Sequence, residues 1–300
     1  MSLRANRVLA VLALLAVCAI WGATFVVVKD AIARMSVADF LAWRFALAAV
    51  AMVALRPNAV RQLGAVGRRD GVLLGLALGA GYLLQTYGLR STPASVSGFI
   101  TGMFVVFTPL GAGILLRRPV GPMAWLAVVV ATVGLGLLAL RGFAVGTGEL
   151  LTLGCALAFA IHIVGLGEWS AGRNPVALAV VQLATVAALG AVAALLAGGA
   201  VGLRPPPDAG VWGALALTAL AATALAFVVQ TWAQSLLSPT RAAVVMTTEP
   251  VFAGIFGVAL AGDQLGWRQL AGAGLVLIAM LLVEARPRRF AGEQIRRLEI

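Results

Sequence analysis

Apolar residues gather in ten stretches along the chain, separated by short polar breaks that contain Pro, Gly or Arg. Each stretch holds about 17 to 25 residues, the length at which a helix crosses roughly 30 Å of hydrocarbon. The pattern therefore predicts an all-α membrane protein with ten transmembrane helices. The predicted spans are residues 8–28, 38–55, 71–89, 95–116, 123–141, 149–168, 175–198, 210–236, 240–261 and 267–284.

The second half of the sequence repeats the first. The motif YLLQTY, which begins at Tyr82, returns 145 positions later as FVVQTW from Phe227. A slightly different shift, of 138 positions, pairs Arg44 with Gln182. Because each copy holds five spans, an odd number, the two copies cross the membrane in opposite directions. Inverted repeats of this kind are typical of alternating-access transporters.

The repeats also divide the chain into parts. We place the first five-helix repeat at residues 1–146, the second at 147–285, and a basic tail at 286–300. The tail is expected to lie along the anionic cytoplasmic surface of the membrane, so lipids are expected partners.

Composition excludes a water-soluble protein. The chain of 30.7 kDa is 62% hydrophobic and 11% charged, with a mean hydropathy of +1.02, which leaves too little polar surface for a soluble domain. The net charge of +11 does not indicate nucleic-acid binding, because the arginines flank apolar spans and no base-reading motif accompanies them.

Positive charge predicts the orientation. With the N-terminus inside, fifteen arginines fall in cytoplasmic segments and six Lys or Arg residues fall on the other side. This excess favours cytoplasmic N- and C-termini and a plasma (inner) membrane location. The first stretch, preceded by Arg4 and Arg7, could instead be a signal peptide. However, it is longer than the usual apolar core and has no clear small-residue cleavage site.

The inventory of reactive residues bounds the chemistry. Cys18 and Cys155 both fall inside spans, and His162 is the single histidine, so we expect no disulfide framework, metal site or cofactor. Lys29 is the single lysine and no phosphate-binding loop is present, which excludes ATP-driven transport by this chain alone.

Three segments carry a family resemblance. They are Ile20–Gly22 (IWG), Trp43–Phe45 (WRF) and Glu249–Ala253 (EPVFA), in the first, second and ninth spans. Their order and spacing resemble the EamA family of the drug/metabolite transporter superfamily, over about residues 8–284. The resemblance implies a ten-helix carrier with a central cavity between the halves, often an exporter of amino acids, other metabolites or toxic compounds.

The chain departs from the family pattern at two places. Family members often carry a Gly-Glu pair near the ends of the fourth and ninth spans, where this chain has Arg117-Arg118 and Gly262-Asp263. The chain therefore lacks the acid that the family pattern has in the fourth span. The family's Trp early in the sixth span is also missing from the segment Ala158–His162, so the cavity wall is expected to differ.

Glu249 is the leading candidate for function. It lies about nine residues into the ninth span, which is about 13 Å at helical rise and close to the bilayer centre. A carboxyl there is expensive unless it faces protein or water, so we interpret it as a proton-coupling group or a partner for a cationic substrate. The alternative is a structural acid, capped by Arg44 or by backbone amides near Pro250. The 145-residue shift places Phe104 at the equivalent point of the first repeat.

Other polar residues inside spans each allow two interpretations. His162 suits proton exchange but could be a hydrogen-bonded structural residue. Gln85, Gln182 and Gln230 could contact substrate or link helices. Arg44 could attract a carboxylate, although snorkelling to lipid headgroups is the simpler account.

The fourth span combines a polar stripe with a proline. Ser97, Thr101, Phe104 and Thr108 recur at steps of four, three and four, which sets them on one helix face that could line a path or pack against other helices. Pro109 here and Pro250 in the ninth span are expected to kink their helices and could act as hinges.

We therefore predict a secondary carrier in which two five-helix halves rock about a midplane cavity, and we expect it to work as an exporter. Protons are a possible coupling ion, with protonation of Glu249 setting the direction. A channel or a non-transporting membrane protein is the alternative, and an intramembrane enzyme is disfavoured because no serine with a basic partner or paired aspartates is present. The predicted cavity residues are Trp21, Thr101, Phe104, His162 and Glu249.

Overall fold

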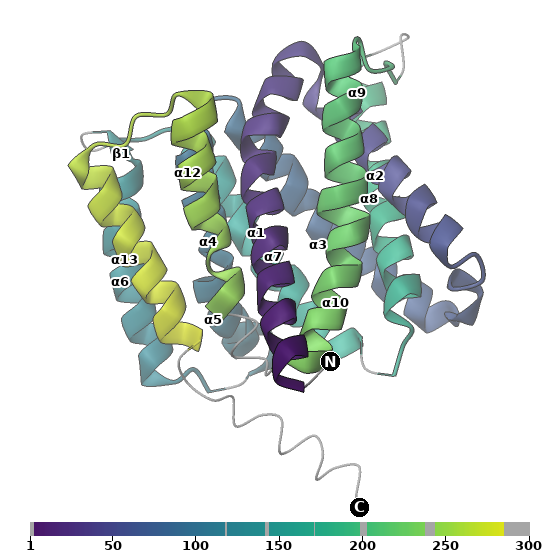
Figure 1. The fold of residues 1–300 in the computed structure, drawn as a ribbon, viewed down its shortest axis with the longest axis horizontal. Helices are drawn as coiled ribbons and strands as arrows, with labels where there is room; N and C mark the ends of the chain where they lie inside the picture. The colour runs from purple at the N-terminus through teal and green to yellow at the C-terminus, as the bar shows by residue number, and fades with distance from the viewer. Residues whose placement is uncertain are drawn as a thin grey trace, which may run out of the picture.

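The computed structural model describes residues 3–117, 119–141, 144–170, 172–198, 203–237 and 244–284 (Figure 1). Its helices are α1 Leu3–Arg34, α2 Val37–Leu55, η1 Val60–Gln62, α3 Ala65–Leu89, α4 Ala94–Gly102, α5 Phe104–Leu116, α6 Pro122–Ala139, α7 Thr147–Trp169, α8 Pro175–Gly198, α9 Ala209–Ala216, η3 Leu217–Leu225, α10 Ala226–Leu236, α12 Glu249–Ala261 and α13 Trp267–Glu284. Two short strands, β1 Leu140–Arg141 and β2 Ala144–Val145, pair antiparallel between α6 and α7.

The prediction of an all-α membrane protein with ten helical crossings is confirmed. Within the described residues, eight helices are long and apolar enough to span a bilayer, and two shorter apolar helices, Ala209–Leu225 and Trp267–Val283, bring the set to ten. The main difference lies at helix ends. α1 extends to Arg34 and α3 begins at Ala65, beyond the predicted limits, because backbone hydrogen bonding continues into polar segments that hydropathy excludes.

The fourth and ninth spans are broken at equivalent positions. α4 and α5 are separated by a turn at Met103, and the helical residues Val244–Met246 are separated from α12 by a turn at Thr247–Thr248. The shift of 145 residues carries Met103 onto Thr248. The inverted repeat is therefore visible in the backbone as well as in the sequence, and each break lies directly before Phe104 or Glu249.

The two breaks have different causes. Pro250 lacks the N–H that would bond the carbonyl of Met246, and its ring crowds that carbonyl, so the ninth span opens there. The hydroxyl of Thr248 donates to the carbonyl of Val245 at 2.6 Å within the turn. In the fourth span the helix continues through Pro109, and the break lies six residues earlier. Pro109 therefore lies inside α5 and not at the break.

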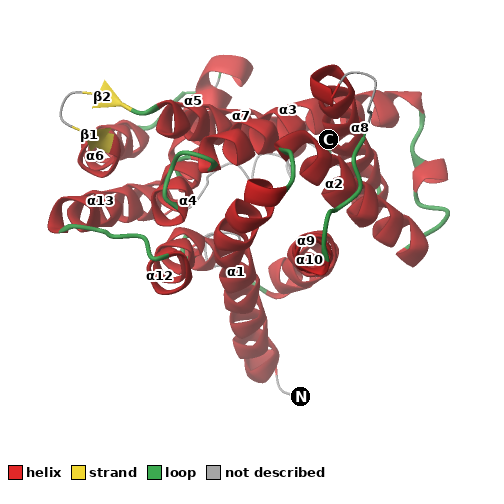
Figure 2. Cartoon of the chain, turned by 90° about the horizontal axis from the view of Figure 1, so that it is seen from above, coloured by secondary structure: helices red, strands yellow, loops and turns green. Residues whose placement is uncertain are grey.

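The two sequence repeats interleave in space. The most extensive contacts join α6 with α13, α3 with α7, α8 with both α2 and α3, and α12 with both α1 and α4. Each of these pairs takes one helix from each repeat. One group contains α4, α5, α6, α12 and α13, and the other contains α2, α3, α8, α9, η3 and α10. The repeat mates α1 and α7 lie between the groups (Figures 1 and 2). Among the described residues, each spatial group therefore takes helices from both repeats.

Small residues let the broken helices cross closely. A Cβ built on Gly102 would lie 2.8 Å from Cγ of Pro250, and one on Gly257 would lie 2.8 Å from the backbone nitrogen of Ser95. Between them, Gly98 of α4 lies against Ala253 of α12. Such small-residue contacts are the usual way for membrane helices to approach, because lipid supplies no hydrophobic force between them.

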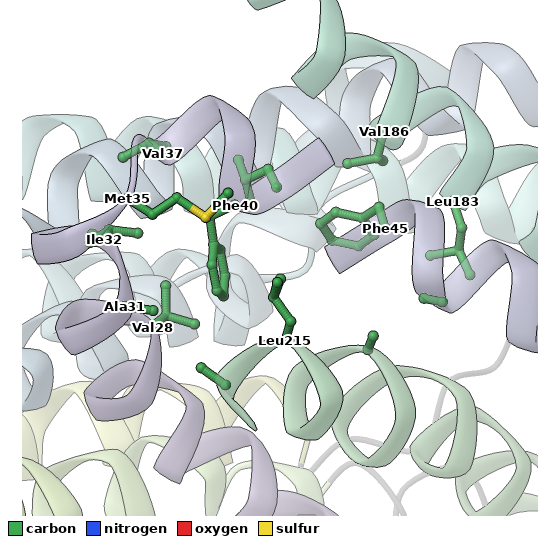
Figure 3. Packing of buried hydrophobic residues seen from close by; sticks show 14 of the residues in the cluster. Val28, Ala31, Ile32, Met35, Val37, Phe40, Phe45, Leu183, Val186 and Leu215 are labelled. Carbon is green, nitrogen blue, oxygen red and sulfur yellow. The ribbon is translucent and has the colours of Figure 1, made fainter. Parts of the chain in front are cut away.

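The largest apolar cluster joins α2 to its neighbours. Phe40 and Phe45 of α2 are fully buried, and they pack with Val28 of α1, Val186 of α8 and Leu215 of α9 (Figure 3). This cluster ties α1 to the group that contains α2 and α8, next to the cavity described below.

Candidate functional site

A cavity of about 180 Å³ lies where the two helix groups meet α1 and α7. It brings together all five residues predicted to border a cavity, and it also includes two of the additional polar candidates. These seven lining residues are Trp21, Arg44, Gln85, Thr101, Phe104, His162 and Glu249. Their shared location is a geometric fact, whereas their contact with a substrate stays a prediction.

Trp21 is held in place by the π-helical segment η3. Its indole Nε1–H donates to the carbonyl of Ala222 at 2.7 Å. Thr24, which also lines the cavity, donates its hydroxyl to the carbonyl of Trp21 at 2.6 Å. The indole is therefore anchored at its polar edge, with its ring in the cavity wall. π-Helical turns often occur at functional sites.

Glu249 lies at the first residue of α12, directly after the break. Within the described part of the chain, no hydrogen bond or ion pair holds its carboxyl group, neither from Arg44 nor from a backbone amide near Pro250. The helix N-terminus favours an acid at this position through its dipole. The structural-cap alternative therefore lacks the partners that we had named for it.

We had expected Arg44 to snorkel to the membrane surface, but its side chain is buried. Its exposed fraction is 5%, and its guanidinium carbon lies 5.0 Å from the ring centre of Tyr82 and 5.1 Å from that of Phe45. Buried Nε has no hydrogen-bond acceptor. The side chain turns inward because the aromatic rings offer it a cation–π surface at the cavity wall.

His162 is oriented by Gln182. Its Nε2 lies 2.6 Å from Oε1 of Gln182, and Nε2 of Gln182 donates to the carbonyl of Leu178 at 3.2 Å. Since the amide oxygen can only accept, Nε2 of His162 must carry the hydrogen. Gln182 is thus a helix-linking residue behind the cavity wall, and it fixes the ring that faces the cavity.

Gln85 and Gln230 make equivalent contacts in the two repeats. Nε2 of Gln85 donates to Oγ1 of Thr101 at 3.2 Å, and Nε2 of Gln230 lies 3.6 Å from Sδ of Met246. The 145-residue shift pairs Gln85 with Gln230 and Thr101 with Met246. Each glutamine therefore links its helix to the segment before a break, and only Gln85 also lines the cavity.

The polar stripe of the fourth span divides at the break. Thr101 and Phe104 line the cavity. The hydroxyl of Thr108 instead donates to the carbonyl of Phe104 at 2.7 Å. Ser97 is fully buried, and its Oγ has no partner. Of the four residues of the stripe, Thr101 and Phe104 therefore belong to the cavity wall.

An aromatic part of the cavity wall could not be read from the sequence. Tyr82 and Phe159 line the cavity with ring centres 5.3 Å apart, and Tyr82 packs on Phe45 at 4.6 Å. Tyr82 opens the repeated YLLQTY motif, which was a usable signal, and Phe159 lies in the segment where the family's Trp is absent. The remaining lining residues are Thr24, Phe25, Val28, Leu78, Leu89 and Ile163.

Asp263 is a second residue whose role the sequence did not reveal. Its Oδ2 accepts hydrogen bonds from the backbone N and from Oγ of Ser95, both at 2.8 Å. Gly262, at φ 69°, ends α12 and turns the chain so that Asp263 reaches the start of α4. The acid of the Gly262-Asp263 pair thus caps a helix outside the cavity.

In the described ranges, no group of three or more His, Cys, Asp or Glu residues could hold a metal ion. Cys18 and Cys155 are buried free thiols.

Comparison with known proteins gives three findings. The sequence matches the EamA-like transporter family over residues 8–140 and again over 146–285. A protein of Archaeoglobus fulgidus named an uncharacterized transporter is 34% identical over 282 residues, which cover 94% of this chain and 87% of the relative. A solved crystal structure with 17% identity has a TM-score of 0.62, covering 97% of this chain and 99% of its own, a likeness of fold alone.

Proposed function

Because the chain belongs to the EamA-like transporter family and is thus a membrane transporter, we propose that it is a secondary carrier that moves a small organic solute by alternating access. The observation that carries the proposal is the cavity beside two helices that break at repeat-equivalent positions. Broken helices of inverted repeats are where such carriers bind their substrates.

The moving bodies of this mechanism are the two spatial groups of helices. α4, α5, α6, α12 and α13 tilt as one body against α2, α3, α8, α9, η3 and α10, with α1 and α7 between them. The domains at 1–146 and 147–285 supply equivalent helices to both bodies, and the turns at Met103 and Thr247–Thr248 supply the hinges. Pro250 acts at its hinge directly, whereas Pro109 acts within α5.

The size of the cavity favours a metabolite over a drug-sized compound. Its volume of about 180 Å³ is below the roughly 300–1,000 Å³ of sites for drug-sized ligands. The solute class is therefore that of amino acids and metabolites of similar size.

We propose that the transporter exports its solute and that proton entry drives this export. Glu249 has no bonded partner among the residues described, so its carboxyl group can exchange a proton or hold a cationic group of the solute, but not both at once. Competition of this kind couples solute release to proton entry. The excess of arginines on one side supports cytoplasmic termini in the plasma membrane.

Counterflow in proteoliposomes tests the carrier. Vesicles preloaded with an unlabelled solute should transiently accumulate the labelled solute, which a channel cannot do. Glu249→Gln should abolish the dependence of transport on a pH gradient. Asp30→Asn, which removes an exposed carboxylate at the far end of α1, should leave it intact. Full-rate transport by Glu249→Gln with an unchanged pH dependence would refute the role of Glu249.

A further inference from the structure

The far face of the bundle is the one at which α1 ends, opposite the N-terminus (Figure 1). Among the lining residues of the cavity, Val28 is the last on α1 and Leu89 is the last on α3. Both side chains are buried, so the cavity is covered at this end. The polar bonds that hold α1 here begin at Lys29, the residue directly after Val28.

One side of the α1 end is held by apolar packing and by an ion pair. Ile32 is buried in the apolar cluster that contains Phe40 of α2 and Leu215 of α9 (Figure 3). Nη1 of Arg34 donates to Oδ1 of Asp208 at 2.7 Å. Asp208 is the N-cap residue of α9, so its carboxylate is fixed in place. The end of α1 is therefore attached to the helix group that contains α2 and α9.

Lys29 reaches from α1 toward a different neighbour. It lies five residues before Arg34, which separates the two side chains by about 140° around the helix axis. Its Nζ donates to the carbonyl of Thr92 at 2.7 Å, and no described carboxylate pairs with it. Thr92 is fully buried and lies two residues before α4. The bond therefore ties the end of α1 to the start of the other helix group.

The two sides of α1 differ in what their separation would expose. Parting α1 from α2 and α9 would bring Ile32 and Phe40 into water and lose their apolar burial. The bond from Lys29 to the Thr92 carbonyl can instead be exchanged for bonds to water, so its net contribution is small. Opening of the far face should therefore separate α1 from the start of α4, while α1 stays with α2 and α9.

We propose that Lys29 is the latch of the far face: its bond to the Thr92 carbonyl keeps the cavity closed there and breaks when the cavity opens to that side. The pair of Arg34 and Asp208 is the anchor, which stays formed throughout. This inference rests on the proposed alternating access, because a latch is needed only if the far face opens and closes. With the proposed cytoplasmic termini, the far face is the external one.

Side-specific labelling of a thiol in the cavity tests the latch. Thr24→Cys places the thiol in the cavity wall, and the two native cysteines, which are buried, are replaced by alanine. A membrane-impermeant methanethiosulfonate is applied to intact cells that express the full-length protein and to inverted vesicles made from them. An epitope tag at the N-terminus identifies the preparation that exposes the far face, so a reversed orientation is not mistaken for a missing latch.

Removal of the ammonium group should open one face only. Lys29→Met keeps the length of the side chain and should raise the labelling rate from the far face by about tenfold, because a hydrogen bond to a charged group is lost. The rate from the opposite face should not rise. Lys29→Arg keeps a donor cation, so it should label at a rate close to that of the wild type.

Arg34→Met is the matched control, because it removes the same charge from the same end of α1. The side chains of Arg34 and Asp208 are 38% and 41% exposed, and exposed ion pairs contribute little to stability. The apolar packing of Ile32 should keep α1 in place without this pair, so labelling of Arg34→Met should stay within about twofold of the wild type.

Two results would overturn the latch. One is an unchanged labelling rate from the far face in Lys29→Met. The other is an equal rise from both faces, which is the result expected if Lys29 only stabilises the fold. Lys29→Gln, which is neutral but polar, should give the same one-sided rise and replaces Lys29→Met if that protein does not fold.

Counterflow separates the latch from the carrier. A far-face labelling rate that depends on Lys29, in a protein without counterflow, would leave the latch standing and refute the carrier. Counterflow by a protein whose far-face labelling is insensitive to Lys29 would do the reverse.

Discussion

Asp263 lies outside the cavity, where it joins the end of α12 to the start of α4. We expect Asp263→Ala to lower the free energy of unfolding. The first N–H groups of a helix have no partner within the helix, and a side chain at the N-cap normally accepts one of them. Pro93 occupies the N-cap of α4 and offers no side-chain acceptor. Asp263, at the end of α12, takes the place of an N-cap side chain: its carboxylate accepts hydrogen bonds from the backbone N and from Oγ of Ser95.

The magnitude follows from these two bonds. Ser95 is fully buried, so removal of the carboxylate strands a backbone N–H that water cannot reach. An N-cap contributes about 0.5–2 kcal/mol, and a hydrogen bond to a charged group about 1.5–3 kcal/mol. The Ser95 hydroxyl can rotate to another acceptor and recover part of its loss. We therefore expect Asp263→Ala to lower the free energy of unfolding by about 2–4 kcal/mol, and Asp263→Asn by about 1 kcal/mol.

Unfolding in mixed micelles by titration with sodium dodecyl sulfate measures this difference. A double-mutant cycle with Ser95→Ala isolates the side-chain bond, with an expected coupling energy of about 1 kcal/mol or more. Both variants keep the cavity lining intact, so ligand binding should not change in the folded fraction. A loss below about 0.5 kcal/mol for Asp263→Ala, or a coupling energy of zero, would refute the cap.

Three further predictions concern positions outside the cavity. Arg117 has φ 53° at the end of α5, where the second repeat has Gly262. Because this left-handed conformation strains a residue with a Cβ, Arg117→Gly should raise the free energy of unfolding by about 0.5–1 kcal/mol. A decrease would show that the backbone at Arg117 is not strained. Gly98→Ala would place a Cβ against Ala253 and should lower the free energy of unfolding by about 1–3 kcal/mol. Gly213→Ala should leave the free energy of unfolding unchanged, because its Cβ would have no atom within 4 Å. The N–H of Val211, and then Arg34, hold the pKa of Asp208 below its ordinary value. The stabilisation from Asp208 should therefore be present above about pH 4 and be lost as the pH falls further, and Asp208→Asn should remove this dependence in thermal unfolding between about pH 5 and pH 3.

Much of the candidate site could be predicted because hydrocarbon penalises polar groups. Glu249 and His162 stand out in the sequence since each lies deep within an apolar span, and both line the cavity. Asp263 did not stand out, because an acid at the end of a span is ordinary. Its partner, Ser95, is 168 positions away, and no local pattern connects the two.

The direction in which Arg44 points was not readable either. An arginine several residues inside a span can reach the headgroups or turn inward, and hydropathy is the same in both cases. The choice depends on the ring faces of Tyr82 and Phe45, which lie on α3 and α2. Stacking against Tyr82 requires the packing of two helices, so it is a tertiary property.

The sequence by itself determined the ten crossings, the inverted repeat and the family. Each of these depends on the transfer of single segments into hydrocarbon, which every segment satisfies on its own. The tertiary structure alone decided that the repeats interleave, that the fourth span breaks at Met103 and not at Pro109, and that Arg44 shares a cavity with Glu249. These features depend on the fit between helix surfaces far apart in the chain. Lipid and protein interiors are equally apolar, so hydrophobicity cannot specify that fit.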